Sequence, residues 1–114
     1  MPLVESTEFP TEAVRDLRGV VRAMYAAAKA AGRSPNELRR LARIGADLTE
    51  ALELASSTSH GTIGYGAAWR RAEAATERLG ELVNALTPGE PIVTAARQRV
   101  SGARVLLRTK SPER

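Results

Sequence analysis

Residues 32–41 read GRSPNELRRL and carry the strongest local signal in the chain. Ser34 precedes Pro35, and Glu37 follows the serine by three residues. In such a capping box the serine side chain accepts a hydrogen bond from the glutamate N–H, and the glutamate side chain reaches back to the serine N–H. Proline suits the first helical position, where its missing N–H would have no partner, and Gly32 suits the end of a preceding helix. The segment therefore predicts two helices joined by a short turn.

Apolar residues repeat at three- and four-residue steps on both sides of this turn and in two later segments. This spacing is typical of an apolar stripe along an α-helix. Glycine, proline and small polar residues separate the segments. The predicted helices are about 11–31, 35–55, 63–86 and 91–108, with Thr11 as the N-cap of the first. Glycines at 61, 64 and 66 leave the start of the third helix open between Thr62 and Gly66. The predicted stripes are Val14, Leu17, Val21, Met24, Ala28 and Ala31; Leu38, Leu41, Gly45, Leu48, Leu52 and Ala55; Tyr65, Ala68, Ala72, Ala75, Leu79, Leu82 and Leu86; and Val93, Ala96, Val100, Ala103 and Leu107.

Four helices of this length with short connections predict an all-α, antiparallel four-helix bundle. Residues 11–108 would form the single domain, with residues 1–10 as a flexible, extended arm containing Phe9, and residues 109–114 as a basic tail. The stripes are rich in alanine, which predicts closely approaching helices and a thin core. We therefore expect a marginally stable monomer, and this expectation favours self-association.

Composition excludes several classes of protein. The 114 residues include no cysteine, so disulfides, thiolate catalysis and zinc–thiolate sites are excluded. No segment approaches the roughly 20 apolar residues of a membrane-spanning helix. Residues 1–6, MPLVES, lack the charged start and apolar centre of a secretory signal. We expect a location in the cytoplasm or in a particle assembled there.

The charge pattern is the main functional signal. The net charge is +4 and the sequence pI is about 10.3, with arginine far more common than lysine. Two basic stripes are candidates for phosphate contacts, because rows of arginine attract phosphate through counter-ion release. They comprise Arg15, Arg18, Arg22, Lys29 and Arg33 on the first helix, and Arg97, Arg104 and Arg108 on the last.

An acidic row lies roughly opposite the apolar stripe of the third helix. It consists of Glu73, Glu77 and Glu81, which are four residues apart. Because such residues should face outward, we expect that they cannot easily meet a basic stripe within the same bundle. Two interpretations remain open: a solvated acidic face, or a face that meets a basic stripe on a neighbouring copy or partner.

The residues give little support for catalysis. Asp47, Glu50 and Glu53 are spaced by three residues, but neither they nor the acidic row lie on an apolar stripe, and no Glu-x-x-His motif accompanies them. His60, the only histidine, is predicted to be an exposed loop residue. We therefore predict a protein that is not an enzyme and needs no cofactor or metal, with a metal-dependent nucleotide hydrolase as a residual alternative.

The candidate protein contacts lie outside the stripes. Trp69 is about 100° from its stripe, where it would cover the bundle edge or anchor a partner. The predicted interface residues are Trp69, Leu54, Val105, Leu106, Arg104 and Arg108. The leading hypothesis is a non-enzymatic interaction protein, a self-associating structural or adaptor component of a larger assembly, with a phage-like connector as an analogy. The alternative is a basic nucleic-acid-binding module that uses the arginine stripes of the first and last helices.

Overall fold

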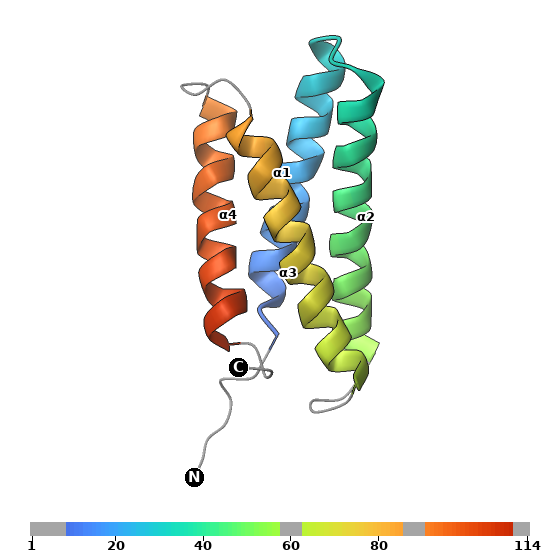
Figure 1. Ribbon diagram of the computed structural model, residues 1–114, viewed down its shortest axis with the longest axis vertical. Coiled ribbons are helices and arrows are strands. Elements are labelled where there is room, and N and C mark those ends of the chain that lie inside the picture. The colour runs from blue at the N-terminus through green and yellow to red at the C-terminus, as the bar shows by residue number, and fades with distance from the viewer. Residues whose placement is uncertain (1–8, 58–62, 86–90, 111–114) are drawn as a thin grey trace.

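The chain folds into a bundle of four helices in which each helix runs antiparallel to the next (Figure 1). The computed structural model describes residues 9–57, 63–85 and 91–110. The helices are α1 (Thr11–Ala30), α2 (Pro35–Ser57), α3 (Ile63–Asn84) and α4 (Pro91–Lys110). The predicted fold is confirmed. α1, α2 and α4 begin at the first residue of their predicted ranges, α3 begins within the predicted window of residues 62–66, and every helix ends within two residues of the predicted end.

The turn between α1 and α2 forms one half of the predicted capping box. Glu37 N–H donates to Ser34 Oγ over 3.2 Å, as the motif requires. The Glu37 carboxylate instead accepts from Arg33 Nη1 at 3.4 Å, in an i,i+4 contact. Gly32 has a φ of 72°, a left-handed conformation that glycine adopts without the steric cost of a Cβ atom.

The start of α1 differs from the prediction. Thr11 is the first helical residue, and Pro10 occupies the N-cap without any side-chain hydrogen bond. The Pro10 carbonyl accepts from Val14 N–H at 3.1 Å, which begins the helical ladder one residue earlier than expected. The predicted Thr11 cap is therefore wrong. The Thr11 hydroxyl donates to the Phe9 carbonyl at 3.4 Å instead.

The apolar stripes of α1 and α4 meet the core as predicted, except that Ala31 is exposed. On α2 the buried face is rotated: Ile44 and Ala51 are buried, whereas Leu52 and Ala55 are only half-buried. The reason is that α2 packs against α3 even more extensively than against α1, so its core side lies between the two neighbours.

Helix α3 buries a wider arc than its predicted stripe. All the predicted stripe residues that the structure describes there are buried, and so are Trp69, Thr76, Gly80 and Val83. The helix lies between α2 and α4 and contacts both extensively, which covers two sides of it (Figure 1). Thr76 satisfies its buried hydroxyl locally, by donating to the Ala72 carbonyl at 2.7 Å. The last predicted stripe residue, Leu86, lies outside the described residues.

Three aromatic rings close the end of the core where α1 and α3 begin. Phe9, Tyr65 and Trp69 contact one another edge to face, with ring centroids 5.3 to 6.5 Å apart. Phe9 N–H also donates to the Tyr65 hydroxyl at 2.6 Å. The exposed fractions are 5% for Phe9 and 1% for Trp69. Phe9 therefore belongs to the core and not to a flexible arm, and Trp69 packs inside the chain, so its predicted role at a protein interface is wrong.

The C-terminal boundary of the domain also differs from the prediction. Thr109 and Lys110 are helical, so the predicted basic tail loses its first two residues to α4. Residues 1–8 of the predicted arm and 111–114 of the tail lie outside the described residues, as does His60.

Candidate anion-binding groove

Arginine–carboxylate pairs cross the interfaces that α2 forms with α3 and that α1 forms with α4. Arg71 pairs with Glu50, and Arg78 Nη1 donates to Asp47 Oδ2 at 2.6 Å, both between α3 and α2. Between α4 and α1, Arg99 Nη1 donates to Asp16 Oδ2 at 3.0 Å. Such exposed pairs add little stability, about 0–1 kcal/mol each, but they neutralise charge along both interfaces.

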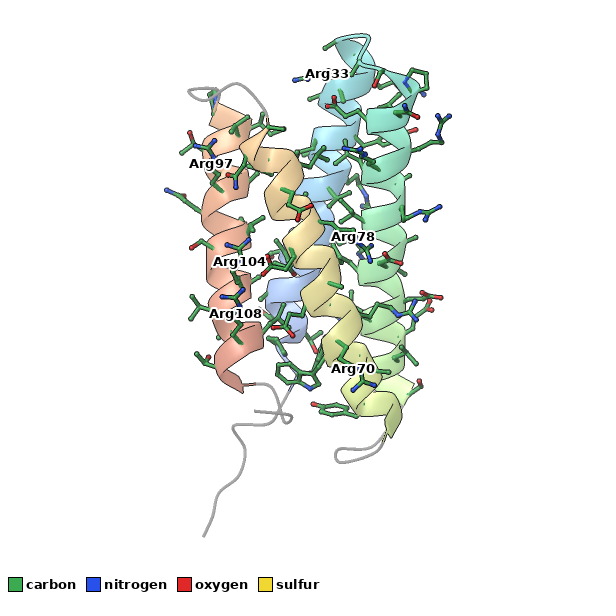
Figure 2. All side chains as sticks on the ribbon, viewed as in Figure 1. Arg33, Arg70, Arg78, Arg97, Arg104 and Arg108 are labelled. Atoms are coloured by element: carbon green, nitrogen blue, oxygen red, sulfur yellow. The ribbon has the colours of Figure 1, made fainter. Side chains whose placement is uncertain are left out.

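A third interface, between α3 and α4, is crossed by Glu77. Its Oε2 lies 3.0 Å from Arg104 Nε and 3.2 Å from Arg108 Nη2. Figure 2 labels these two arginines on α4. Gly80 leaves room for this arrangement, because a Cβ atom there would stand 2.7 Å from Arg104 Nη2. The expectation that the acidic row cannot meet a basic stripe in the same bundle is therefore wrong for Glu77.

The burial of α3 explains this correction. Because the core-facing arc of α3 is wide, Glu73 and Glu77 lie at its edge instead of opposite the core, and there they border α4, whereas Glu81 lies on the side that faces α2. Glu73 is half-buried and Glu81 is exposed, so the row does not form one uniformly solvated face.

The fourth interface, between α1 and α2, carries no interhelical ion pair among the described residues. Four cationic side chains instead follow the α1 side of it without a carboxylate partner in the described part of the chain: Arg15, Arg18, Arg22 and Lys29. The α2 side offers small or neutral side chains: Ala42, Gly45, Thr49 and Leu52. The first helix therefore presents its predicted basic stripe along an interface that has no interhelical ion pair among the described residues and only one carboxylate, Glu53, on the α2 side.

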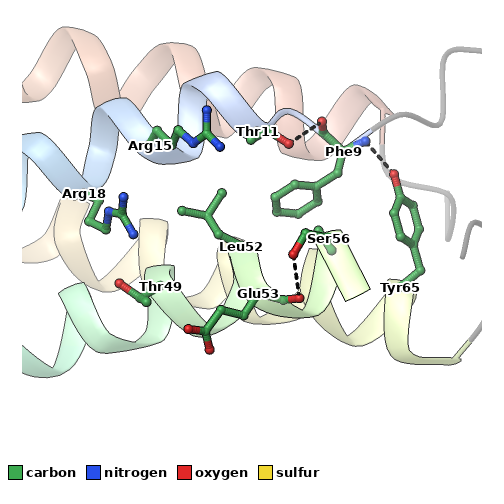
Figure 3. A pocket seen from close by; sticks show the side chains of 10 residues that line it. Phe9, Thr11, Arg15, Arg18, Thr49, Leu52, Glu53, Ser56 and Tyr65 are labelled. Atoms are coloured by element: carbon green, nitrogen blue, oxygen red, sulfur yellow. Dashed lines mark hydrogen bonds between the residues drawn. The ribbon is translucent and has the colours of Figure 1, made fainter. Parts of the chain in front are cut away.

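Two adjoining cavities hollow this interface. The first, of about 340 Å³, lies beside Phe9 and is lined by Arg15 and Arg18 from α1 (Figure 3). The second, of about 350 Å³, lies further along the two helices and is lined by Arg18, Arg22 and Tyr25. Arg18 and Thr49 line both cavities, so the two lie next to each other.

We call the two cavities together the α1–α2 groove. Glu53 is the only carboxylate among the residues that line it. The groove thus combines three arginines with a nearly uncharged opposite wall, an arrangement that can attract an extended anion.

The remaining predicted phosphate contacts are less available. Arg33 pairs with Glu37, while Arg104 and Arg108 pair with Glu77. Arg97 is exposed and has no ion pair among the described residues. The basic stripe of α4 is therefore partly neutralised within the bundle, in contrast to that of α1.

Sequence reasoning missed two exposed arginines on α2, Arg40 and Arg43. They line a cavity of about 260 Å³ between α2 and α3, together with Arg78 and Glu81. Because Arg78 is paired with Asp47 and Glu81 adds a negative charge, this cavity has mixed charge. Their positions two and five residues after Leu38 place them on the α3 side of α2, a side that the sequence alone did not identify.

The apolar side chains that were predicted to contact a partner differ in their exposure to solvent. Val105 is 57% exposed and is the only large hydrophobic residue with an exposed side chain among those described. Leu106 and Leu54 are half-buried, and Leu54 packs against the core. The end of α4 therefore offers a single valine and part of a leucine instead of a broad apolar patch.

Comparison of the chain with protein-family models, curated proteins and solved structures finds no match. Among the described residues, no three His, Cys, Asp or Glu side chains gather in a way that could hold a metal ion. None of the described helices combines the length and apolar character needed to cross a membrane.

Proposed function

We propose that the protein is a non-enzymatic nucleic-acid-binding protein and that the α1–α2 groove is its binding surface. The observation that carries this proposal is the charge distribution over the four helix interfaces. Arginine–carboxylate pairs cross three of them in the described residues, and the fourth has no such pair and presents Arg15, Arg18, Arg22 and Lys29 without carboxylate partners.

The spacing of these cations suits a chain of phosphates. From Arg15 to Lys29 the α-helical rise spans about 21 Å. Arginine guanidinium groups that lack a carboxylate partner are free to bind phosphate oxygens in a bidentate manner. Binding would release counter-ions from the nucleic acid, which supplies a favourable and salt-dependent free energy.

Salt dependence provides the test. Four phosphate contacts to a single strand predict a slope of about −2.8 in log K against log salt, or about a 50-fold loss of affinity between about 50 and 200 mM salt. Replacing Arg15, Arg18 and Arg22 by glutamine leaves one contact and a slope of about −0.7. Fluorescence anisotropy with a labelled oligonucleotide of about 12 nucleotides, within the site size of such surfaces, measures both slopes.

A matched control separates the groove from the overall charge. Replacing Arg40, Arg43 and Arg97 by glutamine removes the same charge from three exposed positions outside the groove. This variant should retain the wild-type slope, and circular dichroism should show that both variants are folded. Equal weakening in the two variants, or no binding by the wild type at low salt, would contradict the proposal.

Self-association through the end of α4 is a second candidate function. It is favoured by Val105, which remains exposed next to the half-buried Leu106. An apolar side chain in that setting gains free energy when a second surface covers it. The oligomeric state in solution tests this candidate.

A further inference from the structure

Tyr25 is the one aromatic residue of the molecule that the core does not bury. The other three rings, Phe9, Tyr65 and Trp69, are buried at the opposite end of α1. Tyr25 is half-buried and lines the α1–α2 groove next to Arg22 and Arg18. Its position places a partly exposed aromatic ring in the row of cations.

The wall that faces Tyr25 leaves space beside the ring. Ala42 and Gly45 of α2 line the same cavity, and both carry minimal side chains. A Cβ atom on Gly45 would stand 3.4 Å from Val21 Cγ1, so the α2 backbone packs against the Val21 side chain at this position. Leu41 and Thr49 complete the α2 side of this cavity, so a flat group that enters it beside Tyr25 meets no charged side chain from α2.

The geometry disfavours a duplex. The major groove of B-DNA is about 12 Å wide and admits one helix. Packed helices lie about 8–10 Å apart, and Arg18 and Arg22 lie on the side of α1 that borders α2. Because α2 lies beside these cations, it would collide with the DNA if α1 entered a major groove with Arg18 and Arg22 facing the base pairs. A single strand has no such requirement and can follow the groove between the two helices.

We infer that the α1–α2 groove binds single-stranded nucleic acid, with one base stacked on Tyr25 and the adjoining phosphates held by Arg18 and Arg22. This inference rests on the proposed function and adds the class of nucleic acid to it. Base stacking on an aromatic ring tolerates any base, because every base has a π-face. The binding should therefore depend on strandedness more than on sequence.

Three variants at one position test the stacking. Tyr25→Leu keeps an apolar side chain in the groove but removes the π-face, and Tyr25→Phe keeps the π-face but removes the hydroxyl. Loss of one stacked base should weaken binding of a short oligothymidylate about 10-fold in the leucine variant. The phenylalanine variant should bind like the wild type, and Tyr25→Trp should bind at least as tightly.

Inorganic polyphosphate and a duplex of the same length serve as the other probes. Polyphosphate has charge but no bases, so its affinity should be equal for the wild type and the leucine variant. The duplex should bind the wild type more weakly than the single strand does at the same salt concentration. Circular dichroism and urea unfolding check that each variant retains its fold.

The outcomes separate this inference from the proposed function. If Tyr25→Leu binds oligothymidylate as tightly as the wild type, or if duplex and single strand bind equally, the inference is overturned while binding through the arginines stands. If the leucine variant loses polyphosphate and oligothymidylate to the same extent, Tyr25 acts on the groove's shape and the stacking is overturned. If the wild type binds none of the three probes at low salt, the proposed function itself fails.

Discussion

At the scale of single residues, the environment of Trp69 shows how a partner distant in sequence decides a side chain's role. Helical spacing places this residue beside the apolar stripe of α3, at an edge that a sequence leaves open to solvent or to a partner. Phe9 covers that edge from the segment before α1, and Tyr65 packs against both rings. The indole is consequently part of the core.

Substitution of Trp69 should measure this packing. Trp69→Ala should lower the free energy of unfolding by about 3–5 kcal/mol, because it removes a large buried side chain and leaves a cavity. Trp69→Phe should cost less, about 1 kcal/mol, because it keeps an aromatic ring and removes an indole N–H that has no hydrogen-bond partner in the structure. Urea unfolding followed by circular dichroism measures both values. An unchanged urea midpoint for Trp69→Ala would place the indole outside the core.

At the scale of helices, periodicity locates each element but does not orient it completely. On α2 the predicted stripe leans toward α1, whereas the buried side lies between α1 and α3. Ile44 and Ala51 are buried for that reason, and Leu52 lies at the edge of the groove. The rotation also places the small side chains of α2 that line the groove on a different side of the helix from Asp47 and Glu50, which pair with α3.

Two glycines should respond to alanine in opposite directions. Gly102 is exposed within α4, and an added Cβ atom would meet nothing within 4 Å, so Gly102→Ala should raise stability by about 1 kcal/mol through helix propensity. Gly32 ends α1 with a φ of 72°, so Gly32→Ala should lower stability by about 1 kcal/mol. Thermal unfolding compares the two variants with the wild type. A gain in Gly32→Ala would show that the left-handed turn is not required.

At the scale of the whole molecule, the apolar stripes of the four helices cover one another within one chain. The core is continuous through all four helices and includes Ala68, Ala72 and Ala75 of α3. Although many of its side chains are small, this core leaves Val105 as the only exposed large apolar side chain in the described residues. Charge, instead of apolar area, therefore distinguishes one face of the bundle from the others.

We expect the protein to be a monomer when no nucleic acid is present. A single exposed valine covers far less area than the roughly 800 Å² that each partner of a stable interface contributes. Multi-angle light scattering over a range of concentrations measures the mass, and Val105→Glu should leave it unchanged. A dimer that this substitution converts to a monomer would contradict the expectation and would favour the second candidate function.

The candidate site was partly predictable. The basic stripe of α1 follows from residue spacing alone, and so does its position beside the apolar stripe. Two further features could not be predicted from residue spacing: Glu53 is the only carboxylate that lines the groove, and Glu77 neutralises Arg104 and Arg108. These features depend on which side of each helix meets its neighbour. The spacing of the arginines does not distinguish those of α4 that are paired from those of α1 that are not.

The sequence by itself determined that this protein has four antiparallel helices, where each begins, and which residues of α1 and α4 enter the core. Helical periodicity, proline, glycine and capping act over a few residues, so their information is local. Only the tertiary structure decided the rotation of α2, the burial of Phe9 and Trp69, and the pairing of Glu77 with α4. Those outcomes depend on contacts between residues tens of positions apart, as in the 31-residue separation of Arg108 and Glu77. The groove exists because packing brings a basic side of α1 against the one side of α2 that carries almost no charge.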